Sequence, residues 1–200
     1  IRALLGKGAD INATNNDGAS ALIAAAYGGH VEATTALLTG GADTAVRDKS
    51  GRTALMASAL GGNVRVTQLL LDRKADPQLD DNNGLNALVY AASTGQDEIV
   101  AALQKAGVTK GTDMALGFAV RGCRIPLATS LLASGASLKA DLGGDNLLAQ
   151  VGRTAGLEHL VFMIPNGTAS TGLRMGLNAF SGGVATFAPL SALPAVSTSM

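Results

Sequence analysis

Short apolar segments alternate with longer amphipathic ones along the first two thirds of the chain. Residues 21–27 and 54–60 are rich in Ala and almost uncharged, and a pair of glycines follows each of them. Segments this short are not stable as isolated helices, so we expect each to be held by packing against its neighbours. The glycines predict sharp helix ends, because the chain must turn there through a conformation that glycine adopts cheaply.

A second, amphipathic helix is predicted after each glycine pair. After residues 54–60, apolar Val64, Val66, Leu69 and Leu70 alternate with polar Arg65, Thr67 and Gln68. This spacing predicts one buried face and one solvated face. The stretch KADPQLDDNNG then predicts an exposed turn, because it is rich in Asp, Asn and Gly. The predicted unit is helix, turn, helix and exposed hairpin turn, which makes the fold all-α.

The whole unit recurs at a fixed interval. Gly18, Gly51 and Gly84 are each 33 residues apart, and the Ala-Leu pair that follows each of them keeps the same spacing. A period of this length is typical of solenoids, in which each unit buries its apolar face against the next. The period predicts the end of a truncated repeat at 1–13 and repeats at 14–46, 47–79 and 80–108.

The pattern weakens beyond residue 108. Residues 109–140 predict a degenerate repeat whose hairpin is shortened by five residues, and residues 141–172 predict another degenerate repeat. Residues 173–200 predict either a decayed capping repeat or a low-complexity tail. A membrane span is a third alternative for this stretch, which its prolines, glycines and serines disfavour. At the other end, the chain starts without Met inside a repeat, so we expect that its N-terminus is missing.

These motifs resemble the ankyrin repeat family. The matching segments are DKSGRTALMASALGGNVRVTQLLL and NNDGASALIAAAYGGHVEATTALLTGGADTAV. The family's Thr-Pro-Leu-His start has lost two residues here: Ala21, Ala54 and Ala87 replace Pro, and Ile23, Met56 and Val89 replace His. The resemblance implies an ankyrin-repeat solenoid of stacked helix-turn-helix units with exposed hairpin turns. The two losses predict looser helix starts, offset in part by apolar packing.

Composition narrows the classes of function. Lys plus Arg and Asp plus Glu number 15 each, so the formal net charge is zero. No global basic field therefore favours nucleic acid or an anionic membrane. The chain is 47% hydrophobic but only 3% aromatic, and its many Ala residues suit closely packed helices. Its one cysteine forms no intramolecular disulfide, so the compartment stays open, although a reducing one such as the cytoplasm fits.

Chemistry-bearing side chains are few and scattered. His30, His159 and Cys123 show no metal-ligand spacing, and a structural role in the Gly-His turn is favoured for His30. Cys123 lies between two arginines, a setting that can make a thiol reactive, but an exposed Cys at a degenerate Gly position is the favoured interpretation. Residues 80–83 lack the closing Glu of a calcium loop. We expect no enzyme activity, no cofactor and no metal.

The positions that differ between units form the predicted binding surface. The resemblance implies that hairpin turns and the exposed edges of first helices line one concave face that binds proteins. The predicted rows are Asn16, Asp17, Ala19 and Tyr27; Arg47, Lys49, Ser50, Arg52 and Leu60; and Asp80, Asn82, Asn83, Leu85, Ser93 and Thr94. Tyr27, Arg47 and Arg52 are the strongest candidates, because Tyr and Arg are enriched among interface hot spots. The basic middle row favours a carboxylate on the partner.

The sequence thus predicts a non-catalytic, monomeric protein-protein interaction module whose partner is another protein, not nucleic acid or a membrane. The alternative is a regulatory or targeting arm of a larger protein, such as an enzyme, whose active domain lies outside this sequence.

Overall fold

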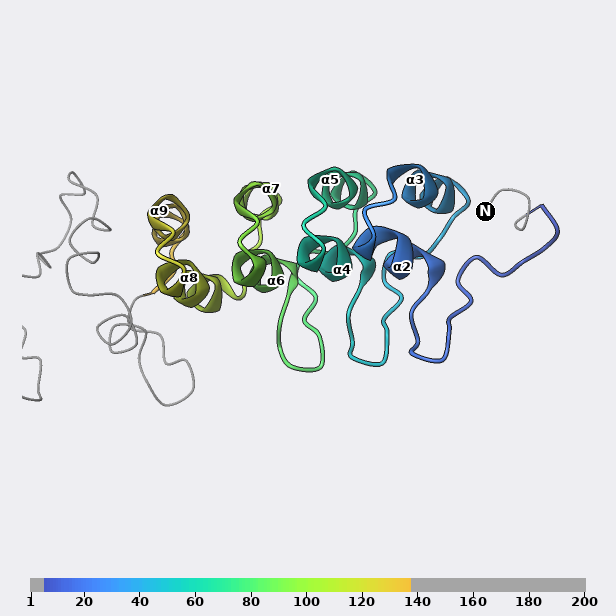
Figure 1. The fold of residues 1–200 in the computed structure, drawn as a ribbon, viewed down its shortest axis with the longest axis horizontal. Coiled ribbons are helices and arrows are strands. Elements are labelled where there is room, and N and C mark those ends of the chain that lie inside the picture. Colours follow the sequence, from blue (N-terminus) through green and yellow to red (C-terminus); the bar gives the residue numbers. More distant parts are fainter. Residues whose placement is uncertain (1–5, 138–200) are drawn as a thin grey trace, which may run out of the picture.

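The computed structural model describes residues 6–137, which form four helix pairs stacked side by side (Figure 1). The pairs are α2 (Ala21–Tyr27) with α3 (Val31–Thr39), α4 (Ala54–Leu60) with α5 (Val64–Asp72), α6 (Ala87–Thr94) with α7 (Asp97–Lys105), and α8 (Thr112–Arg121) with α9 (Ile125–Ala133). Extended pairing in this range is limited to one isolated bridge between Thr14 and Ser20. The predicted all-α repeat solenoid is confirmed. The units predicted at 141–172 and 173–200 lie outside the described residues, and the unit boundaries stay predictions.

The helices form two rows. The first helices α2, α4, α6 and α8 lie in one row, and α3, α5, α7 and α9 lie in the other (Figure 1). Consecutive first helices contact one another more extensively than consecutive second helices do. The first helices are rich in Ala, and small side chains let helices approach closely. Hairpin turns project from the first-helix row before α2, α4 and α6 (Figure 1).

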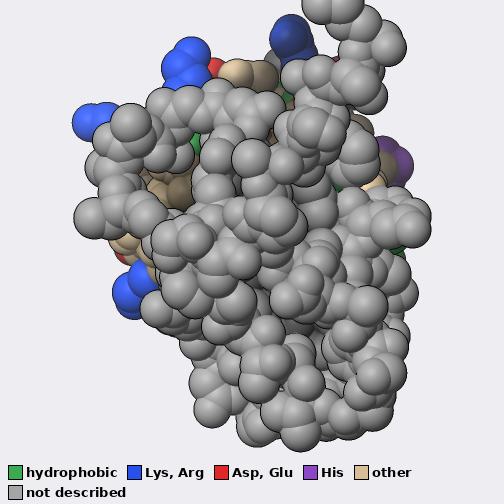
Figure 2. All heavy atoms as spheres, turned by 90° about the vertical axis from the view of Figure 1, so that its left-hand side faces the viewer, with side chains coloured by type: hydrophobic (Ala, Val, Ile, Leu, Met, Phe, Trp, Pro, Cys, Tyr) green, Lys and Arg blue, Asp and Glu red, His purple; other side chains and the backbone are tan. Residues whose placement is uncertain are grey.

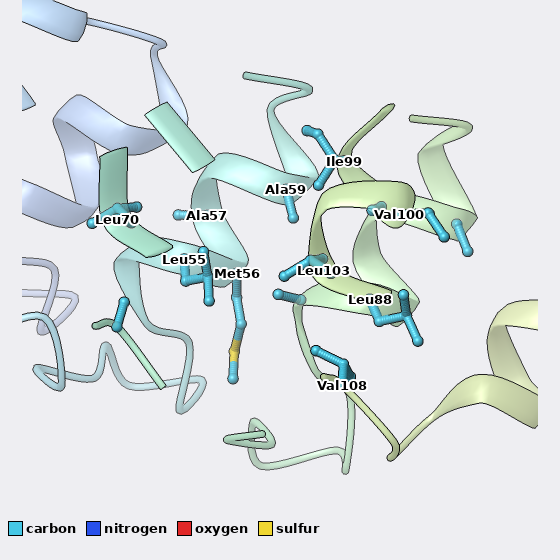
Figure 3. Close-up of a cluster of buried hydrophobic side chains, with 14 of the residues drawn as sticks. Leu55, Met56, Ala57, Ala59, Leu70, Leu88, Ile99, Val100, Leu103 and Val108 are labelled. Atoms are coloured by element: carbon cyan, nitrogen blue, oxygen red, sulfur yellow. The ribbon is translucent and has the colours of Figure 1, made fainter. Parts of the chain in front are cut away.

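One hydrophobic core runs through all four pairs. Leu22, Leu55, Leu88 and Leu116 occupy the same place in the four first helices, and each is at most 1% exposed. Burying a side chain of this size stabilises the fold by about 1.5–3 kcal/mol. Figure 3 shows how apolar side chains of α4, α5, α6 and α7 gather between neighbouring pairs. The repeated Ala-Leu start therefore places one core leucine in each unit.

One predicted solvent-facing position of α5 is wrong. Thr67 is fully buried, whereas Arg65 and Gln68 are exposed as predicted. The Thr67 hydroxyl donates to the Asn63 carbonyl at 3.0 Å and lies 2.9 Å from Ser58 Oγ in α4. A threonine on a helix can satisfy its hydroxyl on the carbonyl one turn earlier. The polar residue is therefore compatible with the buried face.

The first helices begin at capping side chains. Ser20, Thr53 and Asn86 accept hydrogen bonds from the backbone amides three residues later, at 3.3, 3.4 and 3.1 Å. A cap of this kind contributes about 1 kcal/mol. The residues that replace the family His are all buried in the core. Capping and burial together order the helix starts for which the missing Pro predicted looseness.

Two residues other than glycine adopt left-handed backbone angles. Cys123 has a φ of 52° in the turn of the α8–α9 pair, where the other three pairs have Gly29, Gly62 and Gly95 with φ values of 69°, 71° and 80°. Lys74 has a φ of 61° after α5, at the place that Gly41 and Gly107 occupy in neighbouring units. The interpretation of Cys123 as an exposed cysteine at a glycine position is confirmed. Each of these two residues carries about 1–2 kcal/mol of backbone strain.

The connection between α7 and α8 differs from the others. It spans residues 106–111, whereas residues 73–86 join α5 to α6 and form a projecting hairpin (Figure 1). The Nδ2 group of Asn86 donates to the Lys110 carbonyl at 3.0 Å, so the short connection packs directly against the start of α6. The hairpin edge therefore ends at the α6 unit among the described residues.

Candidate functional site

A single side chain holds each hairpin in shape. Asp48 Oδ1 accepts hydrogen bonds from the amides of Ser50 and Arg52, both at 2.9 Å, and the Asp48 amide donates to the Arg52 carbonyl at 3.0 Å. Asn15 and Asp81 make the same pair of bonds to the amides two and four residues later. Asx side chains commonly organise turns in this way. Our sequence analysis missed these three residues as hairpin anchors, although their 33-residue recurrence was a visible signal.

Neighbouring hairpins are joined into a continuous edge. The Lys49 amide donates to the Asp17 carbonyl at 2.9 Å, and the Asn82 amide donates to the Ser50 carbonyl at 3.0 Å. The Asn82 side chain adds a third bond, from Nδ2 to the Lys49 carbonyl at 2.9 Å. The hairpins at 14–20, 47–53 and 80–86, with the exposed sides of α2, α4 and α6, are called the hairpin surface below. The structure brings the predicted rows together on this surface.

The two arginines predicted as partner contacts already make contacts within the chain. Arg47 donates from Nε to the Gly51 carbonyl at 3.1 Å and from Nη2 to the Asp80 carbonyl of the next hairpin. Arg52 contacts Asp48 Oδ2 through Nε at 2.9 Å and Nη2 at 2.8 Å. A partly exposed Arg–Asp pair of this kind also positions the hairpin. Direct binding of a partner by these arginines stays a prediction.

The other predicted hairpin residues are accessible to different degrees. Asn16, Asp17, Lys49 and Asn83 are exposed, while Leu85 is half-buried. Among the described residues, the Lys49 ammonium has no ion-pair or hydrogen-bond partner, so its charge is available to a ligand. Asp80 is paired with Lys110, with 3.5 Å between Oδ2 and Nζ.

A tyrosine that sequence analysis did not single out joins α6 to its own hairpin. The Tyr90 hydroxyl donates to Asp81 Oδ2 at 2.7 Å. Burial raises the pKa of Asp81, but hydrogen bonds from Tyr90 and from the Leu85 and Asn83 amides outweigh it and lower the pKa below its ordinary value. Burial, followed by the contact with Asp81, raises the pKa of Tyr90 to about 12. The site therefore pairs a carboxylate with a neutral phenol at neutral pH.

A groove lies between α2 and α4. It is lined by Ile23, Tyr27, Arg52, Ala57 and Leu60, and its volume is about 310 Å³. Tyr27 is 58% exposed and is the one large hydrophobic side chain so exposed among residues 6–137. Three of the predicted residues, Tyr27, Arg52 and Leu60, thus come together at one concave place. The other predicted residues line the hairpins and are not part of the groove.

On the opposite side of each turn, the residue before the second helix ties neighbouring units together. The Asn63 side chain donates from Nδ2 to the carbonyls of Ala26 and Tyr27 at 3.0 and 2.8 Å. Arg124 donates to the Gly95 carbonyl and pairs with Asp97 at 3.0 Å. His30 occupies the same position, but its side chain makes no capping hydrogen bond. The predicted structural role of His30 is therefore limited to its backbone, since its ring is exposed.

The described residues offer little for other kinds of site. Residues 6–137 contain no group of three or more His, Cys, Asp or Glu side chains arranged to hold a metal ion. Each helix in the same range is too short or too polar to cross a membrane. Seen along the stack from the α9 end, Lys and Arg side chains lie at separate points of the margin (Figure 2).

Stacked helix pairs, hairpins joined edge to edge and a groove between first helices define a helical-repeat solenoid. The family model for ankyrin repeats (3 copies) matches residues 1–81 and 62–141, and the chain belongs to this family. No curated protein matches the chain. Ankyrin repeats are generally protein-protein interaction modules and are typically not catalytic.

Proposed function

We propose that this chain is a non-catalytic module that binds a partner protein through its hairpin surface, the concave face of the stack. The observation that carries the proposal is the groove between α2 and α4, where a 58% exposed Tyr27 adjoins Leu60 and Arg52. Tyr and Arg side chains in a concave, partly apolar setting are typical of interface hot spots.

The geometry of the hairpins supports this function. Backbone bonds between adjacent hairpins, with the side-chain anchors Asn15, Asp48 and Asp81, fix the surface before any partner arrives. A preformed surface loses little conformational entropy on binding. The surface therefore presents its variable side chains at fixed spacings, which favours recognition of one shape of partner.

The charges suit a protein partner better than nucleic acid. The formal net charge of the chain is zero, and nucleic-acid binding draws most of its affinity from basic surfaces. We expect the module to act as a monomer, because each hairpin is joined to its neighbours within the same chain.

The proposal is tested by capture of partners on the full chain. Proteins from the source lysate are passed over the immobilised chain, over Tyr27→Ala/Leu60→Ala, and over the matched variant Arg65→Ala/Gln68→Ala, which changes the exposed side of α5. The first variant is expected to lose the retained proteins, and the second is expected to keep them. Retention that is lost only with the α5 variant would place binding on the second-helix row and overturn the proposal.

A further inference from the structure

The groove owes its space to one small side chain. Ala57 lies on its floor, nine positions after the hairpin anchor Asp48. In the next unit Tyr90 stands nine positions after Asp81, and its hydroxyl reaches that carboxylate. In the α8 unit the same place holds Phe118, whose ring packs 4.9 Å beneath the Arg121 guanidinium. Large side chains thus fill this position in the α6 and α8 units, and Ala57 leaves it open beside α2.

The two ends of the groove have different chemistry. Arg52 precedes the start of α4, whereas Leu60 ends α4 and Tyr27 ends α2 beside it. Ile23 and Ala57 lie between and are only 6% and 4% exposed, so the floor is apolar. A helix of the length of α4 spans roughly 10 Å, which about three extended residues of a peptide also span.

The hairpin end carries an excess of positive charge. Its hairpin holds Arg47, Lys49 and Arg52 against one carboxylate, the buried Asp48. Arg47 binds carbonyl groups and Lys49 binds no group of the described chain, so neither charge is neutralised by an ion pair. The exposed Asp17 on the adjacent hairpin offsets part of this excess and leaves one net positive charge.

From these observations we infer that the groove takes an extended acidic peptide segment of the partner protein. A large apolar side chain of the segment packs on Ala57 between Tyr27 and Leu60, and an Asp or Glu about three residues away meets Lys49 and the exposed edge of Arg52. Opposite charges at the rim select such a segment over a basic one. The inference rests on the proposed function and specifies the partner's chemistry.

The experiment selects ligands from a library of random dodecapeptides displayed on phage, with the full chain as bait. Enriched peptides are synthesised with a fluorescent label, and their affinities are measured by anisotropy. We expect enrichment of peptides that hold an Asp or Glu about three positions from a large apolar residue. Their binding is expected to weaken as salt is raised, because exposed charges are screened.

Variants of the chain test the two ends of the groove. Ala57→Tyr gives the second unit the residue that the third unit has, and it is expected to lower affinity at least about tenfold by filling the floor. Tyr27→Ala, at an exposed position, is expected to do the same without touching the core. Lys49→Glu is expected to lower affinity about fivefold, and Arg65→Glu on α5 is the matched charge control. Circular dichroism and melting temperature show that each variant is folded.

The outcomes separate this inference from the proposed function. Peptides that lose binding with Tyr27→Ala but show no acidic preference overturn the inference and leave hairpin-surface binding in place. Peptides that bind all hairpin-surface variants equally overturn both. A library that yields no enriched peptide also contradicts the inference, whereas the lysate capture with Tyr27→Ala/Leu60→Ala still tests the proposed function.

Discussion

The α2–α4 and α6–α8 regions of the stack share one helical framework but present different surfaces. Both place a leucine at most 1% exposed at the same point of each first helix. The first region carries hairpins before both helices and a groove floored by Ala57, whereas the second fills the same position with Tyr90 and Phe118 and lacks a hairpin before α8. The comparison teaches that the buried positions fix the fold, while single side chains on the first helices decide where a ligand can enter.

The largest predicted effect tests whether the framework is the same in both regions. Leu55→Ala and Leu88→Ala each remove a fully buried side chain and are expected to lower the free energy of unfolding by about 2–5 kcal/mol. Urea denaturation followed by circular dichroism measures the loss. Leu60→Ala, at the half-buried groove wall, is the control and is expected to cost much less. A small effect of Leu88→Ala alone would show that the two regions are not equally packed.

A smaller effect is expected where Tyr90 distinguishes the second region. Tyr90→Phe removes the hydrogen bond to Asp81 and is expected to cost about 1.5 kcal/mol at pH 7. Tyr27→Phe is the matched control, because Tyr27 has no hydrogen-bond partner among the described residues. Equal stabilities of Tyr90→Phe and the parent chain would show that the bond contributes nothing in solution.

The same contact predicts a dependence on high pH. The pKa of Tyr90 is raised from 10 to about 12 in the fold, so its contribution is complete below pH 10 and is lost as pH rises towards 12. Unfolding midpoints between pH 9 and about pH 12 are therefore expected to fall more steeply for the parent chain than for Tyr90→Phe. Parallel pH curves would contradict the raised pKa.

Two threonines at equivalent positions of α3 and α5 offer a finer comparison. Thr67 is buried with its hydroxyl bonded to Ser58 and Asn63, whereas the buried Thr34 hydroxyl has no partner. Thr67→Val is expected to lower the free energy of unfolding by about 1 kcal/mol, since it also leaves Ser58 without its partner. Thr34→Val is expected to be neutral or stabilising. Urea midpoints measure both, and a loss on Thr34→Val equal to that on Thr67→Val would contradict this account.

The smallest effect concerns the left-handed residues that replace glycine. Lys74→Gly is expected to raise the free energy of unfolding by about 0.5–1 kcal/mol, because glycine adopts the φ of 61° without strain. Arg73→Gly, one residue earlier at a negative φ, is the matched control and is expected to destabilise the chain. Differential scanning calorimetry resolves the shift. A lower melting temperature for Lys74→Gly would show that Lys74 makes a contact that offsets the strain.

Most of the fold could be predicted from the sequence, because the period repeats the same demands on each unit. Glycine turns and the Ala-Leu starts recur at visible spacings, and their positions lead directly to helix ends and core leucines. Thr67 could not be placed, because its polarity gives no sign of the Ser58 hydroxyl opposite it. The roles of Arg47 and Arg52 within the hairpins were hidden for a similar reason, since their acceptors are backbone carbonyls and a buried carboxylate.

The candidate site was predictable only as rows of variable positions. Tyr27, Arg52 and Leu60 were named from those rows, but the groove between them depends on the small size of Ala57. The contrast with Tyr90 becomes meaningful once its hydroxyl is seen to reach Asp81. Both features depend on side-chain packing between units, which a repeat pattern does not specify.

The location of partner binding is tested most directly by site-specific photo-crosslinking. A benzoylphenylalanine is introduced in place of Leu60 on the groove wall or in place of Gln68 on the exposed side of α5, and the full chain is irradiated in the source lysate. The account predicts partner crosslinks from the Leu60 position that Tyr27→Ala abolishes, and none of the same mass from the Gln68 position. Partner crosslinks from the Gln68 position alone would contradict it.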